Sequence, residues 1–184
     1  MLWEAILLGM AIGWLRGGSY KYLSRVNLVG WPLILLALLL QATLRLDFNY
    51  YDSTFSSVYP FLYILSFILL LVFVILQKKQ AGIIIFGLGI MLNLLVISAN
   101  QGRMPVATST MPAEKAAELD AGTASPFHMT MIEDTPLAFL GDIIPLPYSE
   151  NKLVSIGDIL LGAGTAVYIQ QNMRKKKKTR KWRP

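Results

Sequence analysis

The sequence contains no cysteine and only one histidine, His128, among its 184 residues. Without cysteine the chain has no disulfide bonds, thiolate metal sites or cysteine nucleophiles. A single histidine leaves no second imidazole for a histidine dyad or a two-histidine metal site. A lone histidine in a loop is also more often a surface residue than a catalyst. Charge is scarce as well, because only 15% of the residues are Asp, Glu, Lys or Arg.

The sequence contains five long runs of apolar residues. Apolar residues make up 54% of the chain, a composition typical of membrane proteins. A helix needs roughly 20 residues to cross a bilayer, and the third and fourth runs approach that length. The first run is short, but Trp3 and Trp14 would lie in the two interfaces and Arg16 would extend to the aqueous side. The runs are Leu2–Leu15, Leu28–Leu44, Tyr59–Leu76, Ala81–Ala99 and Ile156–Asn172.

The gaps between these runs differ in charge. Carboxylates are absent from residues 16–27, from residues 77–80 and from the tail after Arg174, which all carry Lys or Arg. Lys and Arg beside membrane spans stay on the cytoplasmic side. We therefore expect an all-α integral membrane protein, a five-span helical bundle over residues 1–173 with its N-terminus out and its C-terminus in. The absence of an Asn-x-Ser/Thr sequon from the external segment, residues 100–155, favours a bacterial cytoplasmic membrane.

The first run carries Gly9, Gly13 and Gly17 at four-residue spacing. Such a stripe lets another helix approach backbone to backbone. Packing against Gly157 and the small residues 162–164 of the last run, inside one bundle, is favoured over a homodimer seam in a multi-span protein.

Two short helices are expected in the external segment. The first, from Pro112 to Ala121, would be capped by Ser109 or Thr110 and stopped by Gly122, and would form a solvated lid. The second, over 135–145, would be capped by Thr135 and is strongly apolar. It is too short to span, so we expect a re-entrant or interfacial helix in the outer leaflet.

Polar residues cluster near the outer ends of the expected spans. Charged and amide side chains in membrane helices are costly and normally face a partner or a wet cavity. Each also has a structural explanation: Asp158 would form a capping box with Ser155, Asp142 would hold a turn, and Arg103 would bind lipid head groups. The candidate catalytic residues are His128, Asp142 and Asp158, and the candidate ligand-binding residues are Asn100, Arg103, His128, Asp142 and Asp158.

Two other chemistries are weakly indicated. A serine or threonine nucleophile would need His128 as its base, and no nucleophile elbow or triad spacing surrounds candidates such as Thr108, Ser109, Thr130 and Thr135. Met129 and Met131 beside His128 suggest Cu(I), because thioethers and imidazole suit that ion. Methionine also fills irregular packing, so we expect no metal.

The tail over residues 174–184 is the most basic stretch of the chain. A basic run directly after a span binds anionic lipids of the inner leaflet, with about 1 kcal/mol for each Lys or Arg. Nucleic-acid binding is the rival interpretation of such a run, and the position after a span disfavours it.

The polar external positions resemble a known family. The segments that carry this resemblance are Asn100–Val106, His128, Thr135–Pro147 and Ser155–Leu160. In them the chain resembles the bacterial multi-pass membrane family catalogued as domain of unknown function 5317. The resemblance covers nearly the whole chain and implies that these outer polar, proline and glycine positions belong to the family pattern. It brings no activity and no cofactor.

Three functions follow as hypotheses. The first is a site for a lipid- or quinone-like amphiphile at the outer interface, with or without catalysis. The second is an accessory or assembly subunit of a larger membrane complex, in which the chain binds a membrane protein partner or a second copy of itself. The third, a small transporter, is disfavoured because the inner halves of the spans offer no continuous polar path.

Overall fold

The computed structural model describes residues 2–50, 56–77, 80–147 and 152–174. Most of this part of the chain is helical, as expected from the sequence. The basic tail from Lys175 onward lies outside the described residues, so its expected lipid contact is a prediction only. The helices are α1 (Leu2–Leu15), α2 (Tyr20–Leu23), α3 (Trp31–Tyr50), α4 (Tyr59–Leu76), α5 (Ala81–Ala99), α6 (Ala113–Asp120) and α7 (Ile156–Asn172).

Four of the five apolar runs form helices with the expected bounds, and the other is shifted. The helix expected over Leu28–Leu44 begins at Trp31 and continues to Tyr50. Its start is delayed because Gly30 has a φ of +72°, a left-handed conformation that ends the preceding turn rather than starting a helix. Pro32 lies in the first turn of α3, where its missing N–H costs no intrahelical hydrogen bond.

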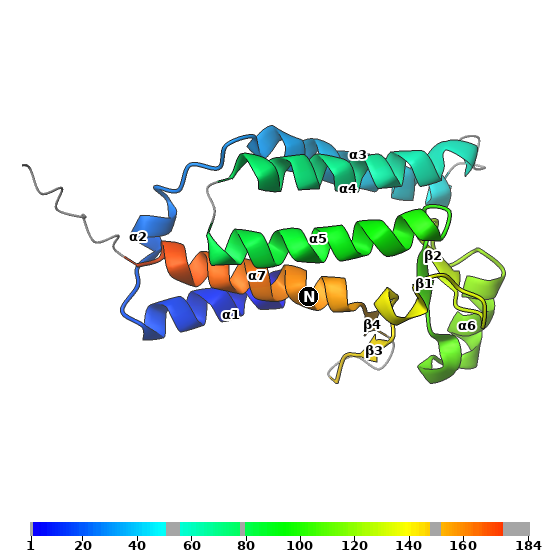
Figure 1. The fold of residues 1–184 in the computed structure, drawn as a ribbon. Coiled ribbons are helices and arrows are strands. Elements are labelled where there is room, and N and C mark those ends of the chain that lie inside the picture. The colour runs from blue at the N-terminus through cyan, green and yellow to red at the C-terminus, as the bar shows by residue number, and fades with distance from the viewer. Residues whose placement is uncertain (1, 51–55, 78–79, 148–151, 175–184) are drawn as a thin grey trace, which may run out of the picture.

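The long helices pack in a row. From one side of the row to the other, α3 packs on α4, α4 on α5, α5 on α7, and α7 on α1. Figure 1 shows these helices side by side, with α2 near one end of their long axes and α6 and the strands near the other end. The core lies around α5, where Ile90, Val96 and Ile97 are fully buried. The outer helices α1 and α3 keep large apolar side chains exposed, including Trp3, Leu7 and Leu36.

Small residues permit the closest approaches in this row. A Cβ added at Gly9 would lie 2.8 Å from the Cα of Ala166 on α7. One added at Gly164 would lie 2.4 Å from the backbone N of Phe86 on α5. The expected packing of the glycine stripe inside one chain is therefore correct for Gly9. It is wrong for Gly17, which follows α1 with a φ of +74° and where an added Cβ would meet no atom within 4 Å.

Two of the helices are long and apolar enough to cross a membrane. Of the described residues, α4 and α5 meet this criterion, while α1 and residues Trp31–Leu46 of α3 are shorter apolar helices. In α4 only 22% of the most apolar window is buried inside the protein, against 44% in α5. The structure thus gives a helical chain with two candidate spans.

The end segment, defined here as residues 100–147 and 152–155, combines short strands with α6. Strand β1 (Met104–Val106) pairs in parallel with β2 (His128–Thr130), and α6 lies between them in the chain. Strand β3 (Ile144–Pro145) pairs antiparallel with β4 (Leu153–Val154). The expected lid helix is confirmed as α6, but neither Ser109 nor Thr110 caps it, because Pro112 occupies the N-cap position. Short 3-10 turns occupy Ser56–Val58 (η1), Thr108–Thr110 (η2) and Ala138–Leu140 (η3).

The helix expected over 135–145 does not form. Leu137 has a φ of +53°, so a helix cannot propagate through it, and only the three-residue turn η3 follows. Thr135 accepts a hydrogen bond of 2.8 Å from the backbone N–H of Ile132 instead of capping a helix. Pairing with β1 outweighs local helix propensity here, because the Asp142 backbone bonds to Pro105 and Ala107.

Candidate functional site

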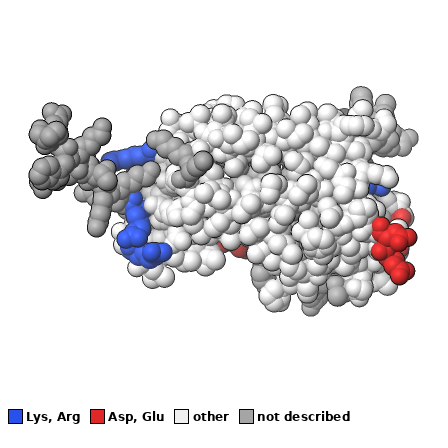
Figure 2. Space-filling model, in the orientation of Figure 1, with Lys and Arg blue, Asp and Glu red and all other residues white. Residues whose placement is uncertain are grey.

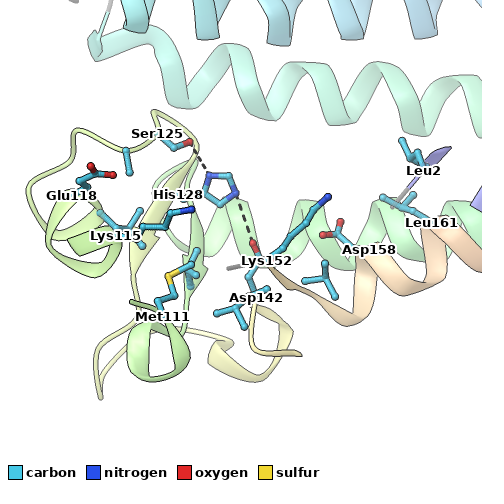
Figure 3. A pocket seen from close by; sticks show the side chains of 15 residues that line it. Leu2, Met111, Lys115, Glu118, Ser125, His128, Asp142, Lys152, Asp158 and Leu161 are labelled. Atoms are coloured by element: carbon cyan, nitrogen blue, oxygen red, sulfur yellow. Dashed lines mark hydrogen bonds and ion pairs between the residues drawn. The ribbon is translucent and has the colours of Figure 1, made fainter. Parts of the chain in front are cut away.

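A cavity of about 590 Å³ lies where the end segment meets α7 and the start of α1 (Figure 3). This volume is in the range of pockets that bind small molecules, about 300–1,000 Å³. The lining combines apolar side chains with acidic and basic ones. The cavity is lined by Leu2, Val106, Met111, Lys115, Glu118, Leu119, Ala124, Ser125, His128, Asp142, Lys152, Leu153, Val154, Asp158 and Leu161.

Strand pairing brings the side chains of His128 and Asp142 to the same face of the paired strands. In the register of β1 and β2, Val106 lies opposite Thr130, and Met104 opposite His128. Asp142 forms an isolated parallel bridge with Val106. Residues paired across parallel strands point to the same face, and residues two apart in a strand share a face. The side chains of His128, Thr130 and Asp142 therefore lie together, although Asp142 follows His128 by fourteen residues.

Aromatic packing holds the start of β2 on the helices. The ring of Phe127 stacks on Tyr63 of α4 with 4.4 Å between centroids. The guanidinium of Arg45 on α3 lies 5.6 Å from the same ring, which suits a cation–π contact. Since His128 is the next residue, these contacts fix the backbone from which its imidazole extends.

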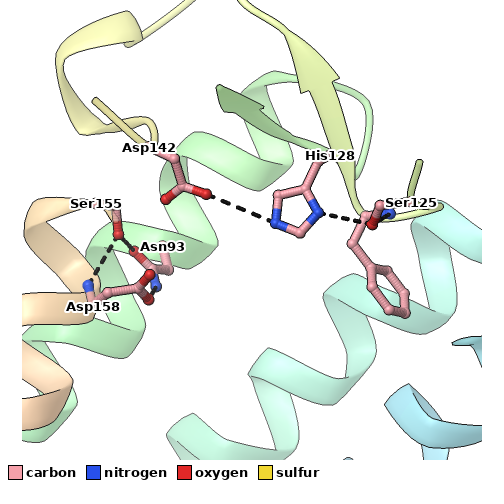
Figure 4. A network of polar contacts seen from close by, with 7 residues as sticks. Asn93, Ser125, His128, Asp142, Ser155 and Asp158 are labelled. Carbon is pink, nitrogen blue, oxygen red and sulfur yellow. Dashed lines mark hydrogen bonds and ion pairs between the residues drawn. The ribbon is translucent and has the colours of Figure 1, made fainter. Parts of the chain in front are cut away.

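His128 bridges two polar side chains (Figure 4). Its Nδ1 lies 2.8 Å from the hydroxyl oxygen of Ser125, and its Nε2 lies 3.7 Å from Asp142 Oδ2. Burial and, less strongly, the positive charge of Arg45 lower the pKa of His128 to about 4. The imidazole is therefore neutral at physiological pH, with one ring nitrogen free to accept a proton.

Asp142 is the least satisfied member of the site. Its side chain is 9% exposed, and its Oδ1 is buried without a hydrogen-bond partner among the described residues. Burial and, less strongly, the nearby charge of Asp158 raise the pKa of Asp142 to about 7. A carboxyl group with this pKa can exchange a proton near neutral pH.

Asp158 is held by a buried network at the start of α7. Asn93 of α5 donates a 2.9 Å hydrogen bond to Asp158 Oδ1, and Ser155 donates a 3.0 Å bond to Asn93 Oδ1. The backbone N–H of Asp158 donates a 2.9 Å bond to Ser155 Oγ, as expected for the N-cap of a capping box. Figure 4 shows this network beside the His128 group.

The structure brings together His128, Asp142 and Asp158 but not the other two candidates. The side-chain amide of Asn100 is buried and donates to the carbonyl oxygens of Val96 and Pro136, so it ties the end segment to α5. Arg103 is exposed and does not line the cavity.

Methionine ligation finds little support in this geometry. Alternation along β2 points Met129 to the face opposite His128, and Met131 follows Met129 with its terminal methyl close to the position of Gly141. Among the described residues no group of three or more His, Cys, Asp or Glu side chains is arranged to hold a metal ion.

Sequence reasoning missed several lining residues. Ser125 precedes His128 by three residues, a spacing at which a serine hydroxyl turns back onto the following backbone, and Phe127 N–H does donate to it at 3.2 Å. That local signal was available in the sequence. Lys115 and Glu118 lie on the helix expected to form a solvated lid, and Lys152 lies in the external segment, yet all three line the cavity.

Comparison with known proteins gives a family but no reaction. The sequence model of a family described as a family of unknown function (DUF5317) matches residues 25–170. A relative from Thermotoga maritima, described as an uncharacterised protein, is 32% identical over 106 residues, which are 56% of this chain. The match spans 60% of that relative's length. No solved structure matches the chain.

Proposed function

The chain belongs to the DUF5317 family, and we propose that it is an integral membrane protein that binds a lipid- or quinone-like amphiphile in the cavity beside His128. The observation that carries this proposal is the lining of the cavity. Leu2, Leu153 and Leu161 offer apolar surface, and Asp142 and Asp158 offer polar groups in the same lining. An amphiphile needs both, because its chain and its head group require different surroundings.

The exposed apolar surface supports a membrane location. A soluble protein buries its most apolar helix, whereas most of α4 is left unburied. The outer helices α1 and α3 also expose leucine and tryptophan side chains. Lipid would cover these surfaces, and all five long helices would then cross or enter the bilayer.

The distribution of charge supports the orientation. Figure 2 shows Lys and Arg gathered at the α2 end of the visible face and Asp and Glu at the α6 end. Positive charge stays in the cytoplasm, so α2 would be cytoplasmic and the end segment external. The cavity would then lie at the outer interface, open to ligands that diffuse within the outer leaflet.

Retained ligand in purified protein tests the proposal. The full chain is solubilised gently, and bound amphiphiles are detected by native mass spectrometry and identified after extraction. We expect an amphiphile in wild type and its loss in Asp142→Asn, Asp158→Asn and His128→Ala, each of which alters a polar lining group. Glu114→Gln is the matched control, because Glu114 is exposed on α6 and does not line the cavity. Equal retention in the control and the three variants would contradict the proposal.

A second function, ester hydrolysis, is favoured by one distance. The 2.8 Å contact between Ser125 Oγ and His128 Nδ1 matches that of a nucleophile and its base. Ser125 Oγ would attack the ester carbonyl carbon while His128 takes the hydroxyl proton and passes it to the leaving alcohol. Water would then attack the acyl-serine and release the acid. Ser125→Ala should abolish hydrolysis of a bound ester and leave binding intact. If wild type hydrolyses no ester that it binds, this second function is wrong.

A further inference from the structure

The unpartnered oxygen of Asp142 shows what the ligand must supply. Asp142 Oδ1 is buried, lines the cavity and accepts no hydrogen bond within the described chain. Leaving a buried polar group unsatisfied costs about 1–3 kcal/mol, and more for a charged group. The other oxygen, Oδ2, already faces His128. A ligand that offers a hydrogen-bond donor to Oδ1 would remove this cost.

The second carboxylate indicates that the donor is cationic. Asp158 lines the same cavity, and its charge acts unfavourably on that of Asp142. Asn93 occupies Asp158 Oδ1, and the positive charge of Lys152 acts on Asp158, so this lysine alone faces two acids. A positively charged N–H group between the carboxylates would hydrogen-bond to Asp142 and reduce the repulsion.

Two lysines indicate a negative group on the same ligand. Lys115 of α6 and Lys152 before β4 are exposed and line the cavity. In Figure 3 Lys115 lies on the α6 side, across the cavity from Asp158 on the α7 side. Lysine binds phosphate as a compact point charge. The lining therefore carries charges of both signs, with the Lys152 side chain extending toward Asp158 and Lys115 across the cavity.

We propose that the cavity binds the head group of a zwitterionic phospholipid with a primary amine, as in phosphatidylethanolamine. The ammonium lies between Asp142 and Asp158, and the neighbouring phosphate lies near Lys152, which extends toward Asp158. The acyl chains leave along Leu2 and Leu161 toward the exposed faces of α1 and α7. This inference rests on the proposed amphiphile site and names its ligand class.

The same contacts disfavour related head groups. Choline has a cation but no N–H, so it leaves Asp142 Oδ1 unsatisfied. Glycerol head groups have hydroxyl donors but no cation to separate the two acids. A bare Ca²⁺ or Mg²⁺ ion would need more oxygen ligands than the two carboxylates provide, because these ions take six or more.

A series of lipids with successively more methyl groups on the head-group nitrogen tests the need for an N–H donor directly. The full chain, stripped of lipid in detergent, is titrated with phosphatidylethanolamine, its N-methyl and N,N-dimethyl forms, and phosphatidylcholine, all with the same acyl chains. Native mass spectrometry counts bound lipid. We expect retention to fall by about tenfold only at the choline form, where the last N–H is lost, since a charge-assisted hydrogen bond has about that effect. A gradual decline with methylation, or equal retention of all four lipids, would overturn the inference.

Variants separate the head group from the cavity as a whole. Asp142→Asn should reduce phosphatidylethanolamine retention by a larger factor than phosphatidylcholine retention, because both cations interact with the carboxylate charge but only the amine donates a hydrogen bond to Oδ1. Lys152→Gln should lower retention of both lipids through their shared phosphate. Glu114→Gln should change neither.

A bulky variant distinguishes failure of this inference from failure of the proposed function. Leu153→Trp places a large side chain in the lining and should lower retention of every lipid. If it does so while wild type binds all four lipids equally, the amphiphile site stands and the amine preference is wrong. If Leu153→Trp changes nothing, the lipids bind elsewhere and both ideas fail. Release of bound phosphatidylethanolamine by Ca²⁺ alone would show that the two acids bind a metal ion instead.

Discussion

Asn93 and Asp158 form a hydrogen bond of 2.9 Å between the middle of α5 and the first turn of α7. The same amide group accepts from Ser155, so one side chain satisfies both polar residues that begin α7. The close approach of the two helices makes this possible, because a Cβ at Gly157 would clash with the Asn93 amide. Asn93 of α5 thus positions the carboxylate of Asp158, and Ser155 holds its backbone.

Replacing Asn93 should therefore weaken the fold. In Asn93→Ala, Ser155 loses its acceptor and Asp158 its donor in a buried setting. We expect a loss of about 1–3 kcal/mol for each group left unsatisfied. Thermal unfolding in detergent measures it. Gln171→Ala removes an exposed amide from α7 and should be nearly neutral. A melting temperature for Asn93→Ala equal to that control would mean that water replaces the lost partners.

Helix contacts at glycine give a second stability prediction. Gly164→Ala should lower the melting temperature sharply, because the new Cβ meets the backbone of Phe86 at 2.4 Å and backbone cannot yield easily. Gly13→Ala should cost less, since its first contact is the flexible Met173 side chain at 2.6 Å. Ala163→Leu, on an exposed face of α7, is the control. The reverse order of the two glycine variants would disprove the assigned packing.

Periodicity and composition predicted the long helices because each is an unbroken apolar run with a clear stop. The bounds of α1, α4, α5 and α7 follow from that pattern alone. The turn around Leu137 could not be predicted in the same way. Its residues are apolar enough for a helix, and only the pairing of Asp142 with β1, thirty-six residues earlier at Val106, prevents it.

The site was predicted in part for the same reason. Asp142 and Asp158 could be predicted because a buried carboxylate is costly, and His128 because it is the single histidine of the sequence. Both are properties of individual residues. The involvement of Lys152 and Glu118 depends on where the end segment folds back, which no local pattern specifies. Glu118 lines the cavity, whereas Glu114 on the same helix is exposed and does not, so Glu114 is the better surface control.

Topology is testable with reporter fusions. Fusions after Lys79 and at the C-terminus should give a cytoplasmic signal, because the basic gaps stay inside. Fusions after Tyr51 and within Ala113–Gly122 should give an external one. The α6 fusion decides between five spans and fewer, since an odd number of crossings separates it from the tail. A cytoplasmic signal from that fusion would be incompatible with the proposed orientation.

The pH dependence of stability should report His128 and Asp142 with opposite signs. The pKa of Asp142 is raised from 3.8 to about 7, so between these values the folded state binds more protons than the unfolded state, and stability falls as pH rises. The pKa of His128 is lowered from 6.5 to about 4, so in that window the unfolded state binds more protons, and stability rises with pH. The two effects oppose each other between about pH 4 and 6.5 in wild type.

Single variants should separate these two slopes. In Asp142→Asn only the histidine remains of the pair, so the melting temperature should climb from pH 4 to 6.5 and then level off. In His128→Gln the aspartate remains, so the melting temperature should decline from pH 4 to 7. Arg45 and Asp158 are the other charges that act on the pair, and both are present in all three proteins. Melting curves in one detergent at half-unit pH steps measure the slopes. Parallel curves for the two variants would show that neither group titrates as its buried position requires.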